Sequence, residues 1–235
     1  MSVTKQAPLP TAARITGRAA RTKKRTRIQV GNEERILDAA LAVFSRYGYR
    51  GGTIDQIAAR AGMSKPNLLY YYRRKKDIYV AVLERTLTMW LAPLESLDAA
   101  GDPQEEVRRY VRRKLALSRS HPEASRLFLS EILQGAPLLR PKLEQELRAQ
   151  VRRKAAVLQG WMDQGRLTPL DPVHLLFTIW ATTQHYADFD SQIRAVLGRE
   201  AMTEAMFETA EATILKLFFE GLGVEGQVDL QRGSR

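Results

Sequence analysis

The sequence predicts an all-α protein of about nine helices, and three observations support that fold class. From residue 33 onward, apolar residues recur with helical spacing, and no stretch alternates as a strand does. Ser or Thr caps, Asp-Pro pairs and terminal glycines mark where helices begin and end. With 235 residues, of which 44% are hydrophobic, the chain can bury a core in one large domain or two smaller ones.

Four helices are expected in the first 90 residues. Ser and Thr side chains accept hydrogen bonds from the amides of a first helical turn, where proline is also tolerated. Thr53 and Ser64 are the expected caps of the second and third helices, while Gly48 and Gly62 end the first and second. The expected spans are residues 33–47, 53–62, 64–72 and 76–89 or beyond.

Prolines and glycines bound the later helices. Asp-Pro pairs open the helices at residues 102 and 171, and Pro122 and Pro141 open two more. Thr203 caps the last helix, which closes near glycines 221 and 223. The expected spans are 102–121, a helix from 122 onward, 141–165, 171–188 and 203–223.

Positive charge is concentrated at the N-terminal end. The full chain carries a formal net charge of +11. Residues 1–80 hold 17 Lys and Arg against five Asp and Glu, a net charge of +12, which leaves residues 81–235 at −1. A basic end joined to a nearly neutral body predicts that the first third contacts a polyanion. A solubilising basic tail is the simpler alternative.

The chain is expected to divide into four segments. Residues 1–31 form a disordered basic arm, since they hold few large apolar side chains; its cations either lie along DNA or exert only a general attraction. Residues 32–78 form a three-helix helix-turn-helix DNA-binding domain, and residues 79–223 a larger helical effector-binding and dimerisation domain. Residues 224–235 form a flexible C-terminal tail.

Several classes of function are not favoured. Without cysteine there is no disulfide framework or thiolate zinc site, and three scattered histidines have no metal-ligand spacing. No nucleophile–base pair or Gly-rich phosphate loop is apparent, so we expect no enzyme, no catalytic residue, no metal and no cofactor. No apolar run is long enough for a membrane span, so we expect a cytoplasmic, nucleoid-associated protein without a membrane partner.

Residues 53–72 have the pattern of a helix-turn-helix motif. Small residues Ala58, Ala61 and Gly62 stand where two helices approach closely, and the second helix of this motif enters the major groove. The cations that follow would neutralise phosphates. An aromatic, basic hairpin that only packs is the alternative. The expected DNA-binding residues are Thr53, Ser64, Lys65, Pro66, Asn67, Tyr70, Tyr71 and Lys75.

The segment "ILDAALAVFSRYGYRGGTIDQIAARAGMSKPNLLYYYRRKKDIYVAVL" resembles the DNA-binding domain of the TetR family of one-component regulators. It departs from the family's usual pattern at Leu69, Tyr72 and Lys76. The blocks "WLAPLE", "ASRLF", "QGAPLL" and "IWATTQHYADF" resemble the pyrimidine-utilisation branch of that family. This resemblance implies a homodimeric transcriptional regulator that binds double-stranded operator DNA. It would act as a repressor or as an activator. Its effector would be a free pyrimidine such as uracil or thymine.

A candidate effector site lies in the expected helix 171–188. Trp180, Gln184 and Asp188 are spaced i, i+4 and i+8 on one face. An indole covers a ring, an amide offers both donor and acceptor, and a carboxylate accepts from a ring N–H. Trp90, with Leu91 beside it, would supply a second wall. The alternatives are core packing, solvation or a subunit interface.

The last two long helices are apolar enough to pair with the same two helices of a second chain, although intrachain packing is the alternative. Two other functions stay open from the sequence. One is a TetR-type regulator of another pathway, such as drug efflux. The other is an architectural DNA-binding protein.

Overall fold

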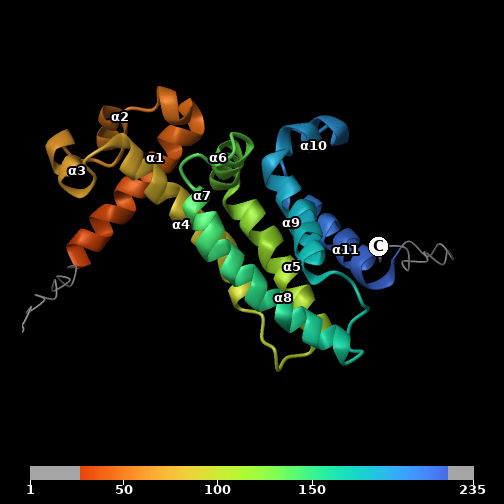
Figure 1. Cartoon of the computed structure of the whole chain (residues 1–235). Helices are drawn as coiled ribbons and strands as arrows, with labels where there is room; N and C mark the ends of the chain where they lie inside the picture. Colours follow the sequence, from red (N-terminus) through yellow and green to blue (C-terminus); the bar gives the residue numbers. More distant parts are fainter. Residues whose placement is uncertain (1–26, 222–235) are drawn as a thin grey trace, which may run out of the picture.

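The computed structural model describes residues 27–221 and contains helices but no strands within that range (Figure 1). This confirms the all-α class. The elements are α1 (Arg27–Gly51), α2 (Ile54–Arg60), α3 (Lys65–Tyr71), α4 (Lys75–Glu95), α5 (Pro103–Ser120), α6 (Pro122–Leu133), α7 (Arg140–Lys142), the π-helical turn η1 (Leu143–Leu147), α8 (Arg148–Asp163), α9 (Pro172–Asp188), α10 (Asp190–Leu197) and α11 (Glu204–Glu220).

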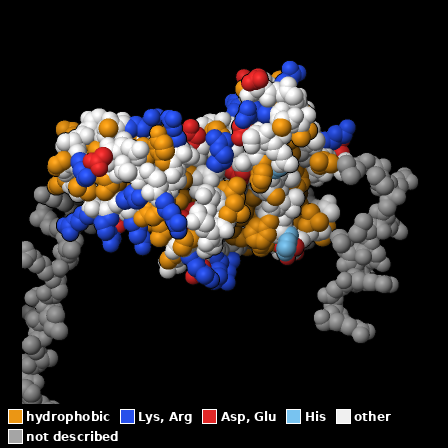
Figure 2. Space-filling model, turned by 90° about the horizontal axis from the view of Figure 1, so that it is seen from above, with side chains coloured by type: hydrophobic (Ala, Val, Ile, Leu, Met, Phe, Trp, Pro, Cys, Tyr) orange, Lys and Arg blue, Asp and Glu red, His pale blue; other side chains and the backbone are white. Residues whose placement is uncertain are grey.

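The helices form two parts that lie end to end. Helices α1, α2 and α3 with the start of α4 make a small head, and the remaining helices make a longer body (Figures 1 and 2). Helix α4 belongs to both parts, because it runs from the head into the body (Figure 1). Within the described residues, no helix is both long and apolar enough to cross a bilayer.

Some boundaries differ from those expected. Helix α1 begins at Arg27, so the last residues of the expected arm 1–31 are helical. It continues to Gly51 across Gly48, whose φ of 68° and ψ of 176° interrupt the helical geometry. Helix α10 was not expected. The rest of the expected arm and the expected tail 224–235 lie outside the described residues.

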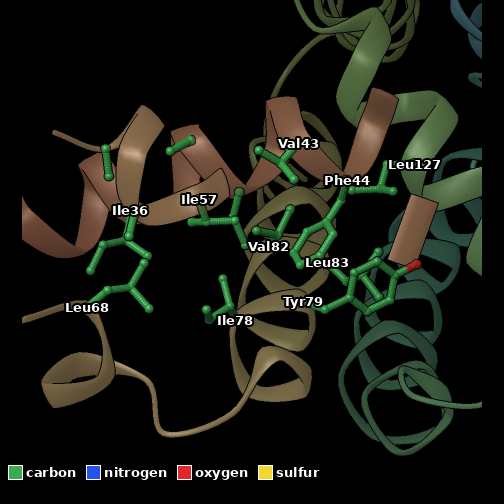
Figure 3. Packing of buried hydrophobic residues seen from close by; sticks show 14 of the residues in the cluster. Ile36, Val43, Phe44, Ile57, Leu68, Ile78, Tyr79, Val82, Leu83 and Leu127 are labelled. Carbon is green, nitrogen blue, oxygen red and sulfur yellow. The ribbon is translucent and has the colours of Figure 1, made fainter. Parts of the chain in front are cut away.

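The head has a core that draws on every one of its helices. Ile36 and Phe44 of α1, Ile57 of α2 and Leu68 of α3 meet Ile78 of α4 there, and each is at most 1% exposed (Figure 3). Full burial of one such side chain contributes about 1.5–3 kcal/mol. Leu68 is the fully buried residue of α3, so this one side chain anchors that helix to the rest of the head.

The body is built around α5. This helix packs against α4, α6, α9 and α11, so its side chains meet those of four neighbours. Its Tyr110 and Val111 are buried with Leu158 and Trp161 of α8 and Leu176 of α9. The indole N–H of Trp161 donates to the Ala99 carbonyl at 3.1 Å, which satisfies its polar atom inside that core.

Helix α6 joins the head to the body. Its Leu127 is buried in the head's core beside Phe44 (Figure 3). Its Glu131 is 3% exposed and accepts hydrogen bonds from the Tyr79 hydroxyl at 3.4 Å and the Leu138 amide at 2.7 Å. Burial, together with the Glu131 charge, raises the pKa of Tyr79 to about 12, so its phenol keeps its proton.

Removing the Glu131 carboxylate is expected to destabilise the protein through this junction. Glu131→Ala leaves the buried Tyr79 hydroxyl and Leu138 amide without an acceptor, so the free energy of unfolding should fall by about 2–3 kcal/mol. Urea denaturation measures this change. Glu123→Ala, on an exposed carboxylate at the start of α6, is the matched control and should cost about 0.5 kcal/mol. Equal losses in the two variants would contradict the assignment.

Candidate functional site

Short-range hydrogen bonds fix the turn between α2 and α3. Thr53 caps α2 in a capping box, in which its hydroxyl accepts from the Gln56 amide at 3.2 Å and its own amide donates to the Gln56 side chain at 2.9 Å. Ser64 caps α3. Gly62 takes a φ of 64°, which a side chain would strain. The guanidinium of Arg35 donates to the Ala61 carbonyl at 2.6 Å, which ties the turn to α1.

The outward side of α3 presents four of the expected DNA-binding residues. Lys65, Pro66 and Asn67 are exposed in the first turn of this helix, and Tyr70 is 73% exposed near its end. Lys65 pairs with Asp55 at 3.0 Å, but both side chains are at least half exposed, so water and salt screen the pair. This surface can therefore approach a polyanion.

The other four expected DNA-binding residues have roles inside the chain. Thr53 and Ser64 are caps, and the Tyr71 hydroxyl accepts from the Asn32 side chain at 2.9 Å. The Lys75 ammonium donates to the carbonyls of Arg50 at 3.3 Å and Gly52 at 3.0 Å. These residues position α3 and the end of α1. Their contact with DNA stays a prediction.

Exposed cations surround this surface. Besides Lys65, exposed Arg and Lys side chains occur on α1, α2 and the connection from α3 to α4, and Figure 2 shows several of them over the head. They are Arg27, Arg35, Arg46, Arg50, Arg60, Arg73 and Arg74, with Lys76 in the first turn of α4. Arg74 is held by Asp77 at 2.8 Å, and Arg60 is an exposed cation outside the run of residues 73–76 from which phosphate contacts were expected.

A second group of polar residues lies inside the body, along the contact between α5 and α9. Tyr110, Lys114 and Ser118 share one face of α5 and are all buried. The Trp180 indole N–H donates to the Tyr110 hydroxyl at 2.6 Å, and the Ser118 hydroxyl donates to the Thr183 carbonyl at 2.8 Å. Polar contacts therefore flank Lys114 one turn away on each side.

Lys114 carries an amine into the core. Its side chain is 2% exposed, and its ammonium lies 4.0 Å from the centroid of the Trp90 ring on α4. Burial lowers the pKa of Lys114 to about 7, and the charge of Asp188 acts in the opposite direction. The indole N–H of Trp90 is buried and has no hydrogen-bond partner among residues 27–221.

Asp188 closes this group at the end of α9. Its carboxylate is half-buried and accepts a hydrogen bond from the Ser125 hydroxyl on α6. Burial raises the pKa of Asp188, while the Ser125 hydrogen bond and the charge of Lys114 lower it. The structure thus brings Trp90 and Asp188, two of the expected effector residues, to the surroundings of one buried lysine.

The remaining expected effector residues are near this group but differ in their freedom to bind. Gln184 is half-buried on α9, one turn from both Trp180 and Asp188. Trp180 already donates its indole N–H to Tyr110, so its ring face is what remains for a ligand. Leu91 packs at the edge of the body's core, and its carbonyl accepts from the Gln150 side chain at 3.1 Å.

The buried polar residues of α5 were not among the expected site residues, although the sequence contains a signal for them. The apolar stripe of this helix consists of Val107, Tyr110, Val111, Lys114, Leu115 and Ser118. These positions repeat every three or four residues, so a lysine among them must be buried. Ser125 has no such signal, because its partner Asp188 is 63 residues away in the chain.

The clearest cavity lies elsewhere in the body. A space of about 890 Å³ opens between the end of α9, α10 and α11, and the expected effector residues do not line it. Its walls include the exposed side chains of Val196 and Leu197, and it holds no buried charged group. At the Lys114 group, in contrast, several polar atoms converge out of solvent.

Comparison with known proteins agrees with the two-part architecture. Residues 36–82 match the family model of bacterial regulatory proteins of the tetR family. Residues 83–225 match that of the C-terminal region of YcdC-like proteins.

Among curated proteins, the chain is 44% identical over 201 residues to the HTH-type transcriptional regulator RutR of Escherichia coli K12. The aligned region covers 86% of this chain and 95% of that protein. It is 29% identical over 174 residues to the HTH-type transcriptional repressor SCO4008 of Streptomyces coelicolor, covering 73% and 87%.

Solved structures show the same fold. The transcriptional regulator SCO4942 of Streptomyces coelicolor has a TM-score of 0.63 and 27% identity, covering 79% of this chain and 96% of that one. AibR, solved with isovaleryl coenzyme A and operator DNA, has a TM-score of 0.61 and 17% identity, covering 80% and 98%, and shows the fold alone. The chain, a helix-turn-helix transcriptional regulator similar to RutR, belongs to the TetR family.

Proposed function

We propose that this protein is a homodimeric regulator of pyrimidine utilisation, whose affinity for operator DNA is controlled by a free pyrimidine such as uracil or thymine. One observation carries the proposal: the 44% identity to RutR extends over 86% of the chain, so it includes the body as well as the head. The resemblance of the body's sequence blocks to the pyrimidine-utilisation branch supplies the effector class.

The proposed contact with operator DNA is made by α3. Its exposed face would lie in the major groove, with Lys65, Asn67 and Tyr70 facing bases or phosphates. Arg60 and Arg73 flank this surface and would neutralise phosphates on either side. The caps and Lys75 hold the helix in place, so its orientation is set before DNA arrives.

The proposed effector site lies between α4, α5 and α9. Trp90 and the ring face of Trp180 would supply apolar walls for a planar ring. Asp188 would accept a ring N–H, and the Gln184 amide would pair with an edge that offers both a donor and an acceptor. This arrangement is supported by the burial of Trp90 and the half-burial of the three α9 residues.

Dimerisation is proposed through α9 and α11. Both helices expose apolar side chains along the protein surface, namely Phe177 at 48% and Leu217 at 46%. Small residues Ala181 and Ala212 are exposed on the same two helices, which would allow close packing against a partner. A two-fold pairing of these helices would place two heads on one pseudo-palindromic operator.

A TetR-type regulator of another pathway, such as drug efflux, is the second candidate. The open cavity of about 890 Å³ between α10 and α11 favours it, because a single pyrimidine needs less space. An architectural DNA-binding protein is a weaker candidate. Such a protein would bind random and genomic fragments with similar affinity, which mobility-shift assays detect.

The first expected outcome concerns DNA. Tyr70→Ala and Asn67→Ala should each weaken operator binding by about 1–3 kcal/mol, or roughly 5- to 150-fold, because they remove groups from the proposed reading surface. Fluorescence anisotropy with operator DNA measures this. Tyr47→Ala, at another half-exposed tyrosine, is the matched control and should bind DNA as the wild type does. Unchanged affinity in both α3 variants would contradict the proposed surface.

The second expected outcome concerns the effector. Calorimetry with uracil, thymine and cytosine should show binding, and Gln184→Ala should weaken it roughly tenfold because one buried hydrogen-bonding edge is lost. Gln192→Ala, at an exposed glutamine that lines the α10–α11 cavity, is the matched control and should bind normally.

The reverse pattern would move the effector site to that cavity. Operator affinity should also change by at least about tenfold when the pyrimidine saturates the protein. If saturating uracil, thymine and cytosine all leave operator affinity unchanged, the proposed regulation is wrong.

A further inference from the structure

A buried lysine lies among the polar residues along the contact between α5 and α9. Lys114 takes part in none of the ion pairs formed among residues 27–221. Its ammonium nevertheless sits in the core over the Trp90 ring. A cation–π contact offsets part of the cost of burying a charge, but a buried ammonium also needs hydrogen-bond acceptors.

A second unsatisfied donor lies beside it. The Trp90 N–H is buried and unpartnered within the described residues, whereas the nearby polar groups of Tyr110, Ser118 and Ser125 are all hydrogen-bonded. An ammonium and an indole N–H are donors only, so neither can satisfy the other. Both are available to an acceptor oxygen supplied from outside the chain.

The role that the structure suggests for Lys114 and Trp90 rests on the function proposed above. We propose that Lys114 and Trp90 recognise a carbonyl oxygen of the effector ring, and that Lys114 takes up a proton when that oxygen binds. The ligand class is a planar ring bearing at least one carbonyl acceptor, as uracil does. Asp188, whose charge acts on Lys114, accepts the ring N–H.

The charges around Lys114 set the direction of the proton exchange. Asp188 of α9 is the charged group that acts on it, and Arg126 of α6 and His185 of α9 act on Asp188 instead. Helix α4 contributes the uncharged Trp90 ring, and on α5 itself burial raises the pKa of Tyr110, which stays neutral. The protonation state of Lys114 therefore depends mainly on its burial and on Asp188.

The protonation of Lys114 determines how the affinity for the effector changes with pH. Burial lowers the pKa of Lys114 to about 7, so most of the lysine is neutral above that pH in the free protein. An oxygen that accepts from the ammonium stabilises the charged form and raises this pKa. Binding therefore takes up a proton above about pH 7, and affinity falls as the pH rises further. Below about pH 6 the lysine is already charged, so affinity levels off.

The experiment is calorimetry of the full-length protein with uracil, at about pH 6, 7 and 8, in two buffers with different heats of ionisation. Proton uptake should rise from near zero at the lowest pH to nearly one proton at the highest. Affinity should fall by up to about tenfold between pH 6 and 8, with most of the fall above pH 7.

Two variants isolate the lysine. Lys114→Met, which keeps the side chain's length without its charge, should bind uracil at least about tenfold more weakly, with no proton uptake and no pH dependence. Arg152→Met, which removes an exposed cation of α8 outside both proposed sites, is the control and should retain the wild-type values. If Lys114→Met does not fold, the wild-type proton uptake decides the question alone.

The outcomes separate this inference from the proposed function. Uracil binding that regulates operator affinity but takes up no proton overturns the inference and leaves the function standing. Binding with proton uptake but without any effect on operator DNA supports the inference and contradicts the proposed regulation. If uracil does not bind at any pH, both are wrong.

Discussion

The short helix α6 fixes the head against the body, which α4 also joins to the head. Helix α6 has Ser125 bonded to Asp188 at the body's polar group, and Leu127 and Glu131 packed into the head. Ser125 and Glu131 are six residues apart, about 9 Å along the helix axis. Packed cores shift between discrete arrangements rather than deforming gradually. A ligand that alters the Asp188–Ser125 contact therefore acts on the same rigid element that supports the helix-turn-helix.

The head is suited to respond as a unit. Helix α3 has one fully buried anchor, Leu68, and depends on the Ser64 cap and the Arg35–Ala61 hydrogen bond for its orientation. Lys75, whose ammonium binds the carbonyls at the end of α1, joins the same network. The residues nearest the proposed DNA surface thus divide into a few that face outward and others that hold them in register. A displacement of α4 or α6 would move both groups together.

The sequence predicted the parts of this structure that local interactions determine. Caps such as Thr53 and Ser64 form their hydrogen bonds within one helical turn. The boundaries of α2 and α3 can therefore be predicted from the sequence. Helix α10 was missed because it follows α9 directly, with Phe189 as an N-cap that makes no side-chain hydrogen bond. The intrachain partners of Lys75 and Asp188 are distant in sequence, so only the fold reveals that Lys75 bonds within the head and that Asp188 meets α6.

Burial of the Lys114 amine has no stabilising role within the fold, but a bound ligand would give it one. A leucine in place of Lys114 would complete the apolar stripe of α5 without the cost of burying an amine. The lysine therefore lowers the stability of the α5–α9 contact in the free protein. An acceptor oxygen bound to its ammonium would offset that cost, so ligand binding would tighten the packing that ends at Asp188 and Ser125. The free energy with which the ligand shifts the position of the head would then come from stabilising a charge that the body alone stabilises poorly.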